Sequence, residues 1–357
     1  MSGVWGKNIK YSVFGESHGK AIGITIDGLP SGVNIDLDYV EFEMARRAPG
    51  RNEYSTSRVE NDSFDILSGY FNGCTTGTPL CAVIWNTSQH SKDYQKDIMR
   101  PGHADYTGSI KYLGFNDYRG GGHFSGRLTA PLVFAGAIAK QILEKNGIVI
   151  GSHIYQIGNI YDIPFNKVNI EPEVLAKLKS NAFPVMDEEK GHEMKDLILS
   201  VKSEQDSIGG VVEAAVLNLP AGLGSPFFDS VESSIAHILF SIPAVKGVEF
   251  GTGFDISKMK GSEANDEFYI EEDKVKTFTN NNGGILGGIT NGMPIVFRAA
   301  FKPTPSIGKL QKTIDIPSME NTQIEIIGRH DPCIVLRAVP VVEAVTAMAV
   351  LDMIRCD

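Results

Sequence analysis

The sequence predicts an α+β fold, with a β–α sandwich core built from pseudo-symmetric β-loop-α units, and three observations predict it. Strand-like runs alternate with helix signals along the chain. The segments 24–47 and 211–239 share one pattern: a strand, the letters LPxG, a short loop, an aspartate and a helix. Glycine-rich loops occur throughout the 357 residues without a low-complexity linker, which favours one continuous core that carries functional loops.

Helix signals end at proline or glycine in three places, as expected of residues that stop a helix. Pro340 fits a first-turn proline ahead of the apolar run VVEAVTAMAVLDMI. The polar segment 171–206 predicts surface helices, which we expect to form a peripheral insertion in a single domain of residues 1–357. The other predicted helices are 36–47 before Pro49, 128–146 before Gly147, and 229–242 before Pro243.

Short runs rich in β-branched residues and bounded by turn residues predict the strands. Two of them, AIGITIDG and VVEAAVLNL, open the two repeated units, so we expect them in equivalent places of the fold. The predicted strands are KYSVF (10–14), AIGITIDG (21–28), LCAVIW (80–85), IVIGSHI (148–154), VVEAAVLNL (211–219), PIVFRAAF (294–301) and IEIIG (324–328).

Composition excludes several classes of protein. The net charge of −10 argues against a nucleic-acid binder, which usually has a basic stripe. No apolar run is suited to span a bilayer, and the opening MSGVWGKNIK lacks the build of a secretory signal. The four cysteines, Cys74, Cys81, Cys333 and Cys356, form no CxxC pair and suggest no disulfide framework. We therefore expect a cytoplasmic protein with no nucleic-acid and no membrane partner.

Arginines and lysines are distributed differently along the chain. Lysines fall mostly in polar, helix-like stretches, whereas arginines stand beside glycine, proline and histidine. The planar guanidinium fork suits carboxylate and phosphate, so arginines held in tight turns indicate a small anionic ligand. The arginines concerned are Arg46, Arg47, Arg51, Arg100, Arg119, Arg127 and Arg329.

Two histidines lie between turn residues, His18 in GESHG and His103 in RPGHAD. A solvated turn histidine is the alternative for either motif alone, but two such histidines near arginine-rich loops favour acid–base chemistry. A metal site of His18, His103, Asp105 and His123 is a further alternative, although HExxH and regular ligand spacing are absent. The remaining histidines, His90, His153, His192 and His237, are expected to be structural or on the surface.

Three more stretches expose backbone or charge. In GGGHFSGR (120–127), adjacent glycines weaken regular structure and leave bare backbone beside polar side chains. In GRHDPC, Arg329 precedes Asp331, and an aspartate kept ionised by arginine could act as a base or form a structural salt bridge. Neither GxxxxGK[ST] nor a strand-borne GxGxxG occurs, but NNNGGILGGITNG (280–292) and FKPTPS (301–306) could present backbone N–H groups and Lys302 to an anion.

Taken together, these stretches form a series that covers nearly the whole chain and strongly resembles the chorismate synthase family. The resemblance implies a carbon–oxygen lyase that converts 5-enolpyruvylshikimate 3-phosphate to chorismate and phosphate by 1,4-elimination. It also implies reduced FMN without net oxidation, and the last common step of the shikimate pathway to aromatic amino acids. The series is GESHG, IDGLP, RRAPG, RPGHADYTG, DYRGGGHFSGRLTA, DSIGG, LPAGLGSP, AVKGVEFG, NNNGGILGGITNG, KPTPSI and GRHDPC with RAVPVVEA.

The resemblance implies catalytic roles for five residues. His18 would protonate or hydrogen-bond the departing phosphate, and His103 would stabilise or protonate the reduced flavin. Asp331 would help to take a proton from flavin N5, with Ser17 and Ser125 as relay groups. In the family, the segment after the triple glycine lies against the flavin, which explains why bare backbone is needed there.

Binding residues also follow from the resemblance. Many members carry Arg-Ser-Ser where this chain has His123, Phe124 and Ser125, and some carry arginine at Glu53, two residues after Arg51. The implied substrate-binding residues are Arg47, Arg51, Arg100, Arg127 and Arg329. The implied flavin-binding residues are His123, Phe124, Ser125, Ala244, Gly287, Lys302, Pro303, Thr304, Pro305, Ser306 and Arg329.

The family resemblance further implies a homotetramer, NADPH as the indirect source of electrons, and a separate flavin reductase as a candidate partner. Two other classes stay open: a non-catalytic protein that binds phosphorylated metabolites, and a metal-dependent hydrolase. The two turn histidines argue against a non-catalytic binding protein. Flavin-dependent release of phosphate from the enolpyruvyl substrate would separate all three.

Overall fold

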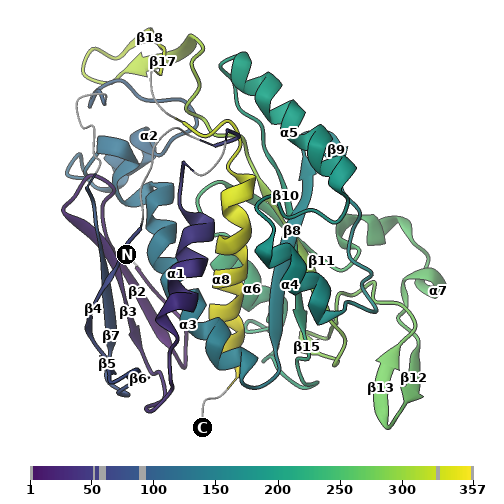
Figure 1. The fold of residues 1–357 in the computed structure, drawn as a ribbon. Coiled ribbons are helices and arrows are strands. Elements are labelled where there is room, and N and C mark those ends of the chain that lie inside the picture. The colour runs from purple at the N-terminus through teal and green to yellow at the C-terminus, as the bar shows by residue number, and fades with distance from the viewer. Residues whose placement is uncertain (1–2, 51–52, 56–61, 88–93, 327–329, 355–357) are drawn as a thin grey trace.

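The computed structural model describes residues 3–50, 53–55, 62–87, 94–326 and 330–354. Within these residues, two five-stranded antiparallel sheets stand on either side of a layer of helices (Figure 1). Of two further helices, one packs on the face of the second sheet away from that layer, and the other packs at its edge strand (Figure 1). This mixed architecture confirms the α+β prediction.

The first sheet has the strand order β1-β2-β3-β7-β4. Its central strand β3 alternates, and the side chains of Ile22, Ile24 and Ile26 are buried toward the helices, as the two-residue period of a strand requires. The strands are β1 (Val4–Trp5), β2 (Lys10–Gly15), β3 (Ala21–Asp27), β7 (Leu80–Trp85) and β4 (Asp65–Ser68), with a small hairpin of β5 (Tyr70–Phe71) and β6 (Cys74–Thr75).

The second sheet has the order β11-β16-β10-β8-β9. Strand β10 is buried along nearly its whole length, because helices cover both faces of this sheet. Its strands are β8 (Val149–Ile157), β9 (Ile160–Tyr161), β10 (Gly210–Leu217), β11 (Val245–Phe250) and β16 (Ile295–Phe301). Small hairpins pair β12 (Phe268–Glu271) with β13 (Lys274–Thr277), β14 (Ile285–Leu286) with β15 (Ile289–Thr290), and β17 (Gln311–Asp315) with β18 (Glu320–Ile324).

Four helices form the layer between the sheets: α1 (Leu37–Arg47), α3 (Thr129–Glu144), α6 (Val231–Leu239) and α8 (Val335–Met353). Asp36 caps α1 by accepting hydrogen bonds from the first-turn amides. The other helices are α2 (Asp105–Lys111), α4 (Pro172–Ser180), α5 (Glu188–Ser203) and α7 (Gly261–Ala264), with 3-10 turns η2 (Arg119–Phe124), η3 (Gly126–Leu128) and η4 (Gly253–Lys258).

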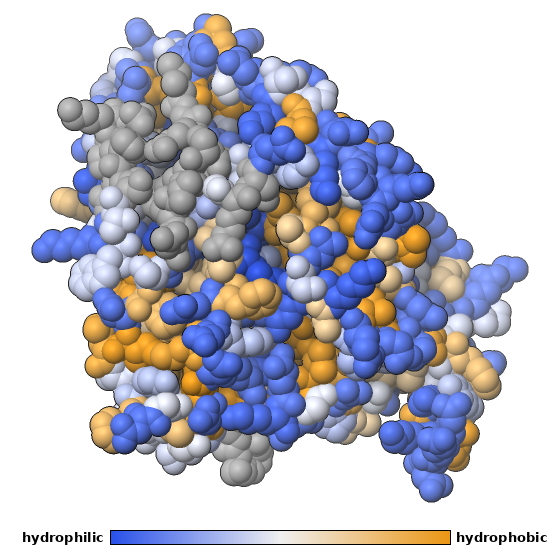
Figure 2. Space-filling view, viewed as in Figure 1, coloured by the Kyte–Doolittle hydropathy of each residue, from blue (hydrophilic) through white to orange (hydrophobic). Residues whose placement is uncertain are grey.

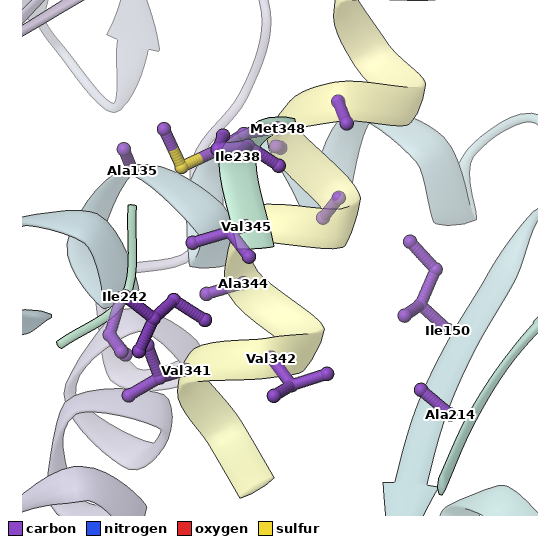
Figure 3. Packing of buried hydrophobic residues seen from close by; sticks show 14 of the residues in the cluster. Ala135, Ile150, Ala214, Ile238, Ile242, Val341, Val342, Ala344, Val345 and Met348 are labelled. Atoms are coloured by element: carbon purple, nitrogen blue, oxygen red, sulfur yellow. The ribbon is translucent and has the colours of Figure 1, made fainter. Parts of the chain in front are cut away.

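Helix α8 is the centre of the core. Figure 3 shows its valines and Met348 directed to α3, α6 and the strands of the second sheet. Helix α3 approaches it closely at Gly136, where an added Cβ would lie 2.3 Å from the Cβ of Ala344. A side chain larger than hydrogen would therefore force the two helices apart.

The repeated units occupy equivalent places. Strand β3 leads through its LPxG loop to α1, and β10 leads through the same letters to α6. Both strands stand third in their five-stranded sheets. This placement agrees with the pseudo-symmetry that the sequence predicts.

Two predicted elements are wrong. Pro340 is not in the first turn of its helix but at the sixth position of α8, which begins at Val335. Proline has no N–H to donate to the Leu336 carbonyl, and the helix tolerates this loss because packing holds the segment on all sides. The run IEIIG is not a strand in the described residues: β18 ends at Ile324, and 325–326 are irregular. The polar residues ENTQI pair instead in a surface hairpin.

The polar segment 171–206 forms α4 and α5, and their apolar faces pack at Leu175, Leu178, Met194 and Ile198. They contact β8 and β9 of the second sheet. The view of this segment as an insertion in one domain stays a prediction. No helix in the described part of the chain is long and apolar enough to cross a membrane.

Candidate active site

A cavity of about 450 Å³ lies where the C-terminal end of α1 meets the N-terminal ends of α3 and α8. These ends are at the top of the helix layer in Figure 1. The cavity brings together loops that are far apart in the sequence. Of the residues predicted for the site, its wall contains Arg47, Arg100, His103, Phe124, Ser125, Arg127, Ala244, Lys302, Thr304, Pro305, Ser306 and Asp331.

Several predicted residues do not line this cavity. Ser17, His18 and His123 lie behind the glycine loop, and Pro303 is flanked by lining residues without being one. Gly287 lies in the turn of the β14–β15 hairpin. Arg51 and Arg329 are outside the described residues. The roles of all these residues stay predictions.

The triple glycine makes room for His18. Gly120, Gly121 and Gly122 all have positive φ, at 59°, 81° and 53°. A Cβ added to Gly120 would lie 2.0 Å from Cε1 of His18, so only glycine fits between that ring and the cavity. The His18 side chain is buried rather than solvated.

Ser17 ties the GESHG loop to the glycine loop. Its amide donates to the Gly122 carbonyl at 3.1 Å, and its hydroxyl donates to the Gly120 carbonyl at 3.0 Å. The same hydroxyl lies 3.2 Å from Nδ1 of His18. The two loops are therefore one unit, and Ser17 orients the imidazole.

Tyr94 connects two of the predicted site residues, and nothing in the sequence singled it out. Its ring meets the His18 ring edge-on at 5.1 Å, and the Arg100 guanidinium lies 5.0 Å from its centroid. Arg100 also forms a two-pronged ion pair with Asp105 at 2.7 and 2.8 Å. Tyr94 lines the cavity between them.

His103 is a neutral imidazole in the cavity wall. Burial, reinforced by the nearby Arg100 charge, lowers the pKa of His103 to about 4. Its Nε2 lies 2.8 Å from the Ser306 hydroxyl. Beside it, Lys302 donates to the Gly102 carbonyl at 2.6 Å, which joins the RPGHAD loop to the KPTPS loop.

Asp62 holds two of the predicted substrate arginines, and no motif in the sequence points to it. Its carboxylate pairs with Arg47 at 2.7 Å and with Arg127. Burial would raise the pKa of Asp62, but the two guanidinium groups outweigh burial and hold it below its usual range. Burial lowers the pKa of Arg47 to about 10, so Arg47 stays charged near neutral pH.

Asp331 pairs with Arg337 in the described structure. The Nη1 atom of Arg337 donates to the Asp331 carboxylate at 2.5 Å, and Nε donates to the Arg47 carbonyl at 3.0 Å. The sequence predicted Arg329 as the partner, which is outside the described residues. Arg337 lies in the RAVPVVEA motif, whose arginine received no role.

The rest of the cavity wall includes the aromatic ring of Phe124 and the residues Ala244 and Thr304. Phe124 is part exposed and packs at a tilt on Tyr112. His123 is not among the residues that line the cavity, and its Nδ1 lies 2.9 Å from the Gly15 carbonyl. Ala244 has a φ of 76°, and its carbonyl accepts from the Lys302 amide at 3.0 Å. The buried Thr304 hydroxyl has no hydrogen-bond partner among the described residues, so it is available to a ligand.

The site is positive although the chain is acidic. Among the described residues, four arginines and Lys302 face three carboxylates, so the site carries two more positive than negative charges. Burial lowers the pKa of His330 as well as that of His103, so neither histidine adds charge near neutral pH. Such a site attracts small anions.

The alternative metal site lacks a ligand cluster. Across the described ranges, His, Cys, Asp and Glu side chains do not gather in any group of three or more that could hold a metal ion. His18, His103, Asp105 and His123 are instead engaged with Ser17, Ser306, Arg100 and a backbone carbonyl.

Comparisons with known proteins agree on one family. Residues 9–354 match the family model described as chorismate synthase. The chain is 47% identical to a chorismate synthase of Dehalococcoides mccartyi, over 99% of this chain and 96% of that protein. It is also 47% identical to a chorismate synthase of Thermococcus gammatolerans, over 97% of this chain and 96% of that protein. A crystal structure of a chorismate synthase superposes with a TM-score of 0.75 at 30% identity, covering 98% of this chain and 92% of that one.

Proposed function

Because this chain belongs to the chorismate synthase family, we propose that its cavity carries out the 1,4-elimination that converts 5-enolpyruvylshikimate 3-phosphate to chorismate and phosphate. The protein is a lyase of the shikimate pathway. The observation that carries the proposal is the cavity itself. Its wall contains arginines, a lysine and two uncharged histidines, His103 and His330, around a space of about 450 Å³. That volume lies in the range of small-molecule sites.

The described residues fit a reduced flavin, which we propose to be FMN. The glycine loop, Phe124 and Pro243 offer a bare and apolar wall for a flat ring system. The unpaired Thr304 hydroxyl and the Lys302 ammonium suit a phosphate tail. When bound, reduced flavin supplies electron density as the carbon–oxygen bond breaks and recovers it afterwards, with NADPH as the indirect source of electrons.

The chain's own residues would bind, orient and move protons. Arg47, Arg100 and Arg127 would hold the phosphate and carboxylates of the substrate, because a guanidinium fork matches those anions. His18, oriented by Ser17, would donate a hydrogen bond or a proton to the departing phosphate. An anion bound beside His103 would favour its protonated form and so raise its pKa from about 4.

Asp331 would accept a proton, with Ser17 and Ser125 as relay groups. Arg337 holds this carboxylate in an ion pair in the cavity wall. The Ser125 oxygen accepts a hydrogen bond from the Arg127 amide at 3.3 Å, which leaves its own proton free to be donated.

The direct test is phosphate release from 5-enolpyruvylshikimate 3-phosphate under anaerobic conditions, with chorismate measured by chromatography. FMN and a chemical reductant together should give equal amounts of phosphate and chorismate. Oxidised FMN alone, or reductant alone, should give neither. Release that ignores flavin but requires an added divalent metal would establish a hydrolase instead, and binding without release would establish a non-catalytic protein.

Assembly and location belong to the same proposal. A homotetramer is supported by large apolar side chains left exposed, such as Leu67 and Trp85 on the first sheet. Figure 2 shows apolar residues gathered at the left of this face, over that sheet. Free thiols at Cys74, Cys81 and Cys333 suit the reducing cytoplasm. A separate flavin reductase would keep the cofactor reduced, and adding one with NADPH should replace the chemical reductant.

A further inference from the structure

We propose that Arg337 is a positioning residue for the elimination, one that fixes the Asp331 carboxylate against the backbone of Arg47. This inference rests on the proposed function, in which Asp331 accepts the proton. The sequence assigned no role to Arg337, and the structure places it in the cavity wall between these two residues.

The contacts carry the inference. Arg337 uses two different nitrogens: Nη1 donates to Asp331 at 2.5 Å, and Nε donates to the Arg47 carbonyl at 3.0 Å. One planar group thus sets the distance between the proposed base and the end of α1. The Arg337 side chain is 19% exposed and that of Asp331 is 10% exposed, so water competes weakly for this ion pair.

The position of Arg337 in the chain explains how it can fix Asp331. Asp331 lies in an irregular segment, whereas Arg337 is the third residue of α8. From Ala338 to Asp352 every residue of that helix is buried, so the backbone that carries Arg337 is held on all sides. A residue on a rigid helix can hold a loop carboxylate within the narrow tolerance that proton transfer needs.

Direct binding of substrate is the competing role for an arginine in this wall. The two roles differ in what they change. A positioning residue lowers the rate of the chemical step and leaves substrate affinity nearly unchanged, whereas an anion-binding residue weakens affinity. They also differ in additivity, because a residue that acts only through Asp331 has nothing left to do once that carboxylate is removed.

The test compares wild type, Arg337→Gln, Arg337→Lys, Asp331→Asn and the double variant Arg337→Gln/Asp331→Asn. Single-turnover phosphate release with reduced FMN gives the rate of the chemical step. Calorimetric titration of substrate without flavin gives the affinity. Thermal unfolding of each variant shows that the fold is retained.

Arg337→Gln should lower the single-turnover rate about 10- to 100-fold, the effect of losing one charged hydrogen bond, while affinity changes less than about threefold. Arg337→Lys should recover part of the rate, since it keeps the charge but cannot reach two acceptors at once. The double variant should be no slower than Asp331→Asn alone.

Three results would overturn the proposal. One is a double variant whose losses multiply, and another is Arg337→Gln with weak binding and a normal rate. The third is Asp331→Asn with wild-type rate, which removes the base on which Arg337 acts. A wild-type protein that releases no phosphate would instead refute the proposed function.

Arg298→Gln is the matched control. Arg298 pairs with Glu213 at 2.8 Å, its side chain is 17% exposed, and it lies on the second sheet outside the cavity wall. Loss of this buried ion pair should lower the melting temperature without changing the single-turnover rate of the folded enzyme. An equal loss of rate in Arg298→Gln would mean that Arg337 acts through general stability, which contradicts the proposal.

Discussion

At the scale of single residues, Gly120 decides whether His18 can occupy its place. We expect Gly120→Ala to lower turnover about 100-fold, because the new methyl group lies where the His18 ring is and small displacements of catalytic groups are costly. Gly121→Ala is the matched control: it has the same kind of positive φ, but its Cβ would meet nothing closer than 3.8 Å. Steady-state phosphate release measures both, and equal losses would show that backbone strain alone is responsible.

His103 should make stability depend on pH. Its pKa is about 4 in the folded protein and near 6.5 when unfolded, so the unfolded chain binds the extra proton between these values. Stability is therefore present above about pH 6.5 and is lost as the pH falls toward 4. Burial is the main reason that the pKa of His103 is low, and the charges of Arg100 and Lys302 lower it further. Asp105 raises this pKa, and His330 lowers it only when it is itself protonated.

Urea unfolding at pH 7 and pH 5 would measure this effect. Between pH 7 and pH 5, the free energy of unfolding should fall by about 1–2 kcal/mol more in wild type than in His103→Asn. His192→Asn, which removes a surface histidine of α5, serves as the control and should behave as wild type. If His103→Asn and wild type lose the same stability, His103 is not neutral in the folded protein.

At the scale of elements, a buried ion network joins the helices behind the cavity. Lys140 of α3 contacts Glu343 of α8 at 2.6 Å and Glu43 of α1 at 3.1 Å, with Arg46 beside them. Burial would raise the pKa of Glu343, but Arg46 and Lys140 outweigh burial and hold it far below its usual range. The network fixes the end of α1 from which Arg47, the next residue, reaches the cavity.

Lys140→Met should therefore destabilise the protein by about 3–5 kcal/mol, because it leaves two buried carboxylates with too little positive charge. Urea unfolding measures this loss. Lys190→Met removes an exposed ion pair with Glu193 on α5 and should leave the unfolding midpoint almost unchanged. A small effect of Lys140→Met would mean that the remaining cations, or protonation of a glutamate, compensate.

Elements were predictable where one local rule dominated. Strand β7 begins and ends where the sequence predicts, since a run of β-branched and apolar residues between turn residues has no good alternative. Pro340 misled the prediction because packing around α8 overrides the local preference of proline for a first turn. The IEIIG run misled it because apolar residues alone do not say whether a partner strand is present.

At the scale of the whole molecule, the sequence predicted which loops meet but not how their charges pair. Glycine, histidine and arginine in tight turns marked the loops that form the cavity wall. Asp62 and Arg337 were missed, because a single carboxylate or a helical arginine carries no local signal, and its role arises only when distant segments fold together. Long-range ion pairs are the part of a site that a single sequence shows least.

The β12–β13 hairpin bears on how whole molecules assemble. Phe268, Ile270 and Val275 share one face of this two-stranded ribbon and are 59%, 77% and 58% exposed. The hairpin projects from the body of the molecule (Figure 1). An isolated two-stranded hairpin is marginally stable in water, so we expect another copy of the chain to cover this face.

Ile270→Asp should therefore weaken the proposed homotetramer, because it would bury a charge in an apolar contact. Light scattering after gel filtration should give about 155 kDa for four wild-type chains of 38.8 kDa, and a smaller mass for the variant. Lys276 lies on the opposite face of the same hairpin, so the control variant Lys276→Gln should have the wild-type mass. Unchanged mass in Ile270→Asp, with native circular dichroism, would show that this face stays in solvent and that the tetramer forms elsewhere.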